Sequence, residues 1–273
     1  MRTLAHISDL HFGTEDAKIA EGLIEDLLRI SPTLVVVSGD LTQRARRCQF
    51  LAAQQFLSRL PFPQLTVPGN HDVPLFDVFR RFLSPLHRYC QMIGPDLDPL
   101  YQDAEMTVLG LNTARSLTWK NGRISVEQME RIQATFKSVS PPALKILVTH
   151  HPFIPPPGDN EGSVQLVGRA QRSLKILDTC RVDLLLAGHL HHGYTGDVRT
   201  HYPATRHAII AAQAGTAISR RVRQQANAYN LITLNSDRID IAVRVWKQGA
   251  FEESITASYY RKGEEWGEAA IFG

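Results

Sequence analysis

Short β-rich runs alternate with longer helical patterns over the first two thirds of the 273-residue chain, and this alternation constrains the fold most strongly. Such an order is typical of βαβ units, in which helices connect the strands of a largely parallel sheet. Helices are predicted over Ala45–Leu60 and after Ser125, which opens a capping box with Gln128. The predicted strands are Thr3–Ser8, Leu34–Ser38, Gln64–Val67, Met106–Leu111, Lys145–Thr149 and Asp183–Ala187.

The pattern changes after residue 191, where strand-like runs replace the helical spacing. We expect His207–Ala212, Tyr229–Leu234 and Ile239–Val245 to be antiparallel strands of a second sheet. No repeat, low-complexity tract or linker divides the chain. We therefore predict a single α/β domain over residues 1–273, with a βαβ part at 1–191 and a strand-rich second sheet and tail at 192–273.

Composition and charge narrow the class of protein. An apolar share of 43% and a charged share of 21% suit a chain with a substantial core, and no apolar run reaches the ~18 residues of a membrane span. The net charge of +3 is spread along the chain, which argues against nucleic acid as a partner. The three cysteines form no C-x-x-C pair and the N-terminal run lacks the apolar segment of a signal peptide, so we expect a cytoplasmic protein. Whether it forms a homodimer stays open.

Polar residues with metal-binding side chains follow five of the predicted strands. Because sites in open α/β sheets form beyond the carboxyl ends of strands, segments far apart in sequence can converge there. A lone histidine at a strand end is more often structural than a ligand, but five such fragments in order argue for one site. The fragments are Asp9-Leu10-His11, Gly39-Asp40, Gly69-Asn70-His71-Asp72, His150-His151 and Gly188-His189-Leu190-His191.

The residue types indicate the kind of metal. Carboxylate, imidazole and amide ligands together suit borderline divalent ions such as zinc, manganese and iron. One carboxylate can bridge two ions held ~3.5–4 Å apart, the separation used by two-metal phosphatases and nucleases. We expect Asp40 to be that bridge.

These motifs, in this order, resemble those of the calcineurin-like metallophosphoesterase superfamily. The context of Asp9 and Asp40 is most similar to the bacterial class III cyclic nucleotide phosphodiesterase branch. The resemblance implies a four-layer α/β/β/α sandwich with two mixed sheets. It also implies one metal held by Asp9, His11, Asp40 and His191, and a second held by Asp40, Asn70, His150 and His189. The family pattern uses the first histidine of the pair His150-His151, and the sequence alone leaves that choice open.

The resemblance and the ligand chemistry predict a phosphoesterase with two divalent ions (manganese, iron or zinc). The expected reaction is in-line attack of a metal-bridging hydroxide on a cyclic nucleotide or small phosphodiester. His71 is the candidate general acid, while Asn70, His71 and Arg44 are candidate contacts to the small-molecule substrate. The alternatives are a phosphomonoesterase or nucleotide-lipid pyrophosphatase of the same fold, and a non-catalytic scaffold.

Overall fold

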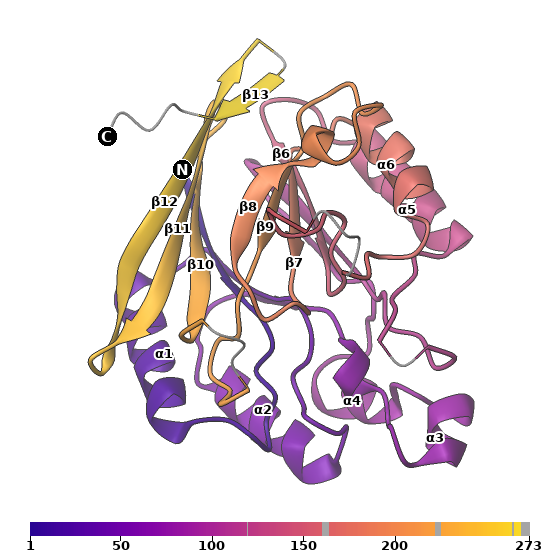
Figure 1. The fold of residues 1–273 in the computed structure, drawn as a ribbon, viewed down its shortest axis with the longest axis vertical. Helices are drawn as coiled ribbons and strands as arrows, with labels where there is room; N and C mark the ends of the chain where they lie inside the picture. Colours follow the sequence, from indigo (N-terminus) through magenta and orange to yellow (C-terminus); the bar gives the residue numbers. More distant parts are fainter. Residues whose placement is uncertain (119, 160–163, 222–224, 264, 269–273) are drawn as a thin grey trace.

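The computed structural model describes residues 1–118, 120–159, 164–221, 225–263 and 265–268 and contains two mixed β-sheets (Figure 1). In the first sheet the strand order is β13-β12-β11-β10-β1-β2-β3, and in the second it is β4-β5-β6-β7-β9-β8. The first sheet comprises β1 (Arg2–Ile7), β2 (Leu34–Val37), β3 (Gln64–Thr66), β10 (Ala228–Leu234), β11 (Arg238–Lys247), β12 (Ala250–Lys262) and β13 (Glu265–Glu268). The second comprises β4 (Leu100–Gln102), β5 (Met106–Leu111), β6 (Leu144–Thr149), β7 (Leu184–Ala187), β8 (Tyr194–Asp197) and β9 (Ile210–Gln213).

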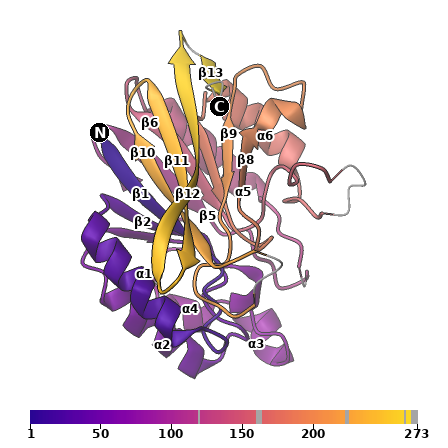
Figure 2. The same cartoon turned by 60° about the vertical axis from the view of Figure 1, so that its left-hand side comes forward.

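Three buried apolar clusters hold four layers together. Alternate residues of a strand point to opposite faces of its sheet, so Leu4 of β1 packs between the two sheets while Ile7 packs toward the helices. The helices α1 (Ala17–Ile30) and α2 (Arg47–Ser58) cover the outer face of the first sheet, and α5 (Val126–Lys137) and α6 (Ala170–Thr179) cover that of the second (Figure 2). The expected α/β/β/α sandwich is confirmed.

The prediction that residues 192–273 build a second sheet of their own is wrong. Strand β10 hydrogen-bonds antiparallel to β1, with Leu4 opposite Ile232, and carries β11 to β13 into the first sheet. Strands β8 and β9 instead join the second sheet, where β9 lies parallel to β7. The second sheet therefore has a parallel centre with an antiparallel strand at each edge, whereas the first sheet has parallel strands β1 to β3 on one side and antiparallel strands β10 to β13 on the other.

The helices fit their sequence signals. Ser125 caps α5 as predicted, because its Oγ accepts from Gln128 N at 3.1 Å and Gln128 Oε1 accepts from Ser125 N at 2.9 Å. The helix predicted from Ala45 begins at Arg47. Two short helices, α3 (Val78–Leu83) and α4 (His87–Met92), follow the loop after β3. Within the described ranges no helix has the length and apolar character needed to cross a bilayer.

Candidate metal centre

Loops at the carboxyl ends of β1, β2, β6 and β7, and the turn η1 (Asn70–Asp72) after β3, bring the predicted site residues together. Half of the ten non-glycine residues with positive φ in the described chain belong to this cluster. Such conformations cost about 1–3 kcal/mol each and persist where the surrounding structure enforces them, often at functional sites. They are Asp9 (φ 53°), His11 (47°), Asp40 (52°), His189 (78°) and His191 (59°).

Two glycines let these loops approach one another. Gly39 has φ +97°, and a Cβ there would lie 2.5 Å from His150 Nδ1. A Cβ on Gly69 would lie 2.1 Å from Asp40 Oδ1 and 2.3 Å from the Asp40 backbone nitrogen. Any larger residue at either position would displace a predicted ligand.

One group of predicted ligand atoms surrounds Asp9. Its Oδ1 lies 3.6 Å from His11 Nε2 and 3.7 Å from His191 Nε2, and His11 Nε2 lies 3.7 Å from Asp40 Oδ2. Ligand atoms that share an ion at about 2.0–2.2 Å are separated by about 3–3.6 Å, close to these values. Asp9 Oδ1 and His11 Nε2 are buried without a hydrogen-bond partner. Because such orphaned groups are costly, their convergence fits a bound cation.

The second group shares Asp40 Oδ2. This atom lies 3.4 Å from His150 Nε2, which lies 3.2 Å from Asn70 Oδ1 and 3.2 Å from His189 Nδ1. Asn70 Oδ1 and His189 Nδ1 are 3.0 Å apart. The seven predicted ligand side chains thus form two adjacent groups joined through one carboxylate.

Hydrogen bonds outside each group orient the ligand atoms. His150 Nδ1–H donates to Ser38 O at 2.8 Å, which turns the Nε2 lone pair toward Asp40. Asp9 Oδ2 accepts from Ser8 Oγ and from the His189 backbone N–H, leaving Oδ1 to face the cluster. Partners of this kind fix ligand orientation in metal sites.

Charges within the cluster suit cation binding. Burial opposes ionisation of Asp40, yet the imidazoles of His150 and His71 hold the pKa of its carboxyl well below the usual range. Burial lowers the pKa of His189 to about 3 and that of His191 to about 4. For His150, burial is outweighed by Asp40, which raises the pKa to about 9. The ionised Asp40 and the neutral His189 and His191 are in the protonation state that metal binding requires, whereas His150 must lose its proton when an ion binds.

The neighbouring His151 makes a different set of contacts. It lies near His150 and His189, but its Nδ1 hydrogen-bonds Thr113 Oγ1 at 2.7 Å and its Nε2 hydrogen-bonds Lys120 O at 2.9 Å. Both ring nitrogens are therefore engaged, whereas His150 Nε2 faces the cluster.

Asp72 ties the ligand loops to one another. Its carboxylate accepts from the backbone N–H groups of Leu41, Thr42 and Gly69 at 3.2, 2.9 and 2.9 Å. Burial and the nearby Asp40 raise the pKa of Asp72 to about 6. Its hydrogen bonds come from turn backbone and from the Thr42 hydroxyl at 2.9 Å rather than from a histidine ring.

A cavity of about 330 Å³ opens over the cluster. His71 lies on its wall, where Nδ1–H donates to Gln43 O at 2.9 Å and Nε2 accepts from Arg221 at 3.0 Å. The cavity is lined by Asp40, Asn70, His71, Lys120, Val164, Gln165, His189, Leu190, His191 and Arg221. Asp9, His11 and His150 are buried beneath it.

A smaller cavity of about 170 Å³ adjoins the first and shares Asn70, His71, Lys120 and Arg221 with it. Arg44 lines this second cavity, 5.7 Å from the Phe76 ring, so all the predicted site residues meet in one region. Sequence reasoning missed Arg221, because no local motif marks it and it enters the site from the loop before β10.

The chain is similar in sequence to two phosphodiesterases. A glycerophosphodiester phosphodiesterase from Enterobacter lignolyticus is 37% identical over 105 residues, a match that spans 34% of this chain and only 36% of that relative. A probable cyclic nucleotide phosphodiesterase from a Synechococcus strain is 22% identical over 70% of this chain and 74% of its own. Both agree with the predicted likeness to the bacterial class III branch.

Solved structures share the fold. A dimetal phosphatase from Danio rerio superposes with a TM-score of 0.66 at 17% identity, covering 89% of this chain and 96% of that one. A purple acid phosphatase from yellow lupin gives 0.64 at 14% identity, covering 93% and 53%. The sequence itself matches the calcineurin-like phosphoesterase family over residues 2–193. The chain therefore belongs to the calcineurin-like phosphoesterase family.

Proposed function

We propose that this protein is a cytoplasmic phosphodiesterase that uses two divalent metal ions to hydrolyse cyclic nucleotides or small phosphodiesters. The observation that carries the proposal is the pair of ligand groups sharing Asp40 Oδ2, with the orphaned Asp9 Oδ1 and His11 Nε2 in one of them. The two curated relatives support the diester preference, since both carry phosphodiesterase names. Strands from both ends of the chain share the first sheet, which supports a single catalytic domain over residues 1–273.

The proposed ligands follow from the atoms that face one another. The first ion would be held by Asp9, His11, Asp40 and His191, and the second by Asp40, Asn70, His150 and His189. Manganese, iron and zinc all accept this mixture of ligands. Bound there, the ions would supply Lewis-acid stabilisation of phosphate charge and activation of water. His150 is preferred to His151 because both ring nitrogens of His151 already have partners.

Residues on the cavity wall would hold the substrate. The cationic residues Arg221 and Lys120 line the cavity over the ligand groups, and Arg44 lines the adjoining cavity. A guanidinium donates two parallel hydrogen bonds to a phosphate. Asn70 lies at the junction of the two cavities, next to His71.

His71 is placed to protonate the leaving group. Its Nδ1–H is committed to Gln43 O, so Nε2 is the atom presented to the cavity. Arg221 now donates to Nε2, and a bound phosphate, as an anionic acceptor, would draw the guanidinium away from it. Once free of Arg221, His71 Nε2 would take up a proton from solvent, stabilised by the bound anionic phosphate, and would then give that proton to the departing alkoxide.

A substrate panel tests this proposal. With manganese added, we expect kcat/KM to be about tenfold or more higher for cyclic nucleotides, glycerophosphodiesters or bis-aryl diesters than for matched monoesters. An Asp40→Ala variant measures the background hydrolysis. A preference for monoesters would instead assign a phosphomonoesterase, and cleavage of nucleotide lipids alone would assign a pyrophosphatase. Absence of hydrolysis by protein shown to contain metal would favour the scaffold.

A further inference from the structure

Helix α3 and the residues around it expose a group of large apolar side chains, termed here the α3 face. Single exposed apolar residues are common on proteins, but contiguous groups mark interaction sites. Each member of the α3 face is 55–81% exposed. The members are Phe76, Val78, Phe79, Phe82, Leu83 and Leu117.

The burial pattern of α3 is the reverse of that of an ordinary surface helix, in which apolar side chains are buried and charged ones are exposed. Its one buried side chain is Arg81, while Phe79, Phe82 and Leu83 face outward. The Arg81 guanidinium donates to Pro74 O at 2.9 Å and to Thr118 O at 2.7 Å. These bonds fix α3 against the loop that carries Leu117 and hold the apolar side outward, so the exposure is built into the fold.

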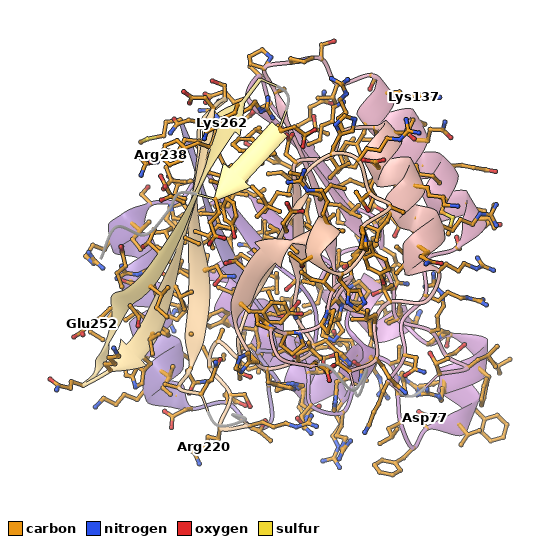
Figure 3. All side chains as sticks on the ribbon, turned by 45° about the horizontal axis from the view of Figure 1, so that its top comes forward. Asp77, Lys137, Arg220, Arg238, Glu252 and Lys262 are labelled. Carbon is orange, nitrogen blue, oxygen red and sulfur yellow. The ribbon has the colours of Figure 1, made fainter. Side chains whose placement is uncertain are left out.

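Basic residues lie beside the α3 face. The Arg88 guanidinium donates to Ala45 O at 2.7 Å and lies 4.0 Å from the Asp77 carboxylate, which brings the exposed Arg46 and Arg47 toward the exposed Arg80 of α3. Arg44 lies 5.7 Å from the Phe76 ring. Asp77 is an acidic residue beside these arginines, and its carboxylate forms an ion pair with Arg80 at 3.1 Å. Figure 3 shows Asp77 at the edge of the molecule. The face therefore combines exposed aromatic rings with a positive border.

This charge pattern favours an anionic bilayer over a second copy of the chain as the partner of the α3 face. A two-fold contact between copies would bring a second set of these arginines into the same interface, and like charges within an interface are unfavourable. An anionic bilayer matches both features, because acidic headgroups attract arginine and the interfacial region accepts Phe and Leu.

The α3 face also adjoins the entrance to the site. Leu75, next to Phe76, lines the smaller cavity together with Arg44. Figures 1 and 2 both place α3 at the end of the molecule where the loops after β1, β2 and β3 lie. A surface seated on α3 would therefore lie beside the cavity mouth.

We propose that the α3 face docks this protein reversibly on anionic lipid bilayers. Phe79 and Leu83 enter the interfacial region, and the arginines contact acidic headgroups. The apolar residues and the positive border act together, as is usual for reversible anchoring without a membrane-spanning helix. The proposal does not depend on phosphodiester hydrolysis, since Phe79, Leu83, Arg46 and Arg47 are neither proposed metal ligands nor proposed substrate contacts.

Co-sedimentation with vesicles tests the proposal. The full chain is mixed with phosphatidylcholine vesicles that contain either no anionic lipid or about one third phosphatidylglycerol, at physiological salt. We expect partitioning to the anionic vesicles to be about tenfold or more stronger than to neutral ones. Phe79→Ser with Leu83→Ser should weaken it about tenfold or more, and so should Arg46→Gln with Arg47→Gln.

The matched control replaces two exposed apolar residues elsewhere, Leu28→Ser on α1 with Ile255→Ser on β12, and should bind as wild type. Because all four apolar positions are exposed, metal content and turnover of a soluble diester serve as folding controls and should not change. Equal binding by the Phe79/Leu83 variant and the control would overturn the proposal. Absence of wild-type binding to the anionic vesicles would also overturn it. In that case sedimentation velocity decides whether the face binds a second copy: the wild-type protein would be a dimer, and the Phe79/Leu83 variant would be a monomer.

Discussion

Replacing Arg221 by glutamine tests whether this arginine holds the substrate. Its guanidinium lines both cavities and lies 3.0 Å from His71 Nε2. A hydrogen bond to a charged group contributes about 1.5–3 kcal/mol, which corresponds to a loss of about 10- to 150-fold in kcat/KM. Because Arg221 is not among the proposed metal ligands, the metal content of the variant should equal that of wild type.

The measurement is release of nitrophenolate from bis(p-nitrophenyl) phosphate, with elemental analysis of the same samples. Arg220→Gln is the matched control, since the Arg220 side chain is 73% exposed and pairs with Asp16 at 3.4 Å; Figure 3 shows it pointing away from the molecule. That variant should retain activity within about twofold, because surface ion pairs contribute little. Arg221→Lys should recover only part of the loss, because it keeps the charge without the planar fork. Equal activity of the Arg221→Gln and Arg220→Gln variants would refute the assignment.

Four further outcomes are expected. His71→Ala should keep its metal but lose about a hundredfold or more in diester turnover, as for loss of a general acid; loss of metal would contradict that role. Asp40→Ala should lose both ions in elemental analysis, because its Oδ2 belongs to both groups, and retention of two ions would exclude it as the bridge. In metal-stripped protein the pKa of His150 is raised to about 9, so the proton competes with metal below that pH and affinity should rise as pH increases from 6 to 9; a calorimetric titration with no change over this range would contradict the assignment. Asp26→Ala should destabilise the fold by about 3–5 kcal/mol in denaturant unfolding, because it leaves buried Arg244 without the carboxylate that it contacts at 2.7 and 2.9 Å; a change below about 1 kcal/mol would show that Arg244 finds other partners.

The strands and their terminal polar residues could be predicted from the sequence because those signals are local. A buried parallel strand is a short apolar run, and the residue after it lies at the sheet edge where sites form. The predicted strand at Met106–Leu111 matches β5 residue for residue. Asp9 and Asp40 lie just beyond the carboxyl ends of β1 and β2, as predicted, and both belong to the ligand groups. Separate loops could therefore be assigned to one site before their geometry was known.

The assignment of strands to sheets could not be predicted in this way. The choice of β1 as the partner of β10 depends on contacts between residues 230 positions apart, such as Thr3 and Thr233. The single sheet expected after residue 191 reflected neighbours in sequence, whereas β9 pairs instead with β7 of the βαβ part, within the second sheet. Register between distant strands is a property of tertiary packing.

The same limit applied to individual side chains in the site. His151 is distinguished from His150 by hydrogen bonds to Thr113 and Lys120, which lie more than 30 residues away in sequence. Arg221 reaches His71 across 150 positions. The inverted exposure of α3 depends on Arg81 finding backbone acceptors in another loop, and no local pattern specifies that contact.

Crystals grown with manganese, with anomalous data collected at its absorption edge, test the central claim most directly. The two groups of ligand atoms that share Asp40 Oδ2 predict two peaks about 3.5–4 Å apart, one beside Asp9, His11 and His191 and the other beside Asn70, His150 and His189. A map with no anomalous density between these side chains, or with the metal bound elsewhere, would contradict the two-metal account.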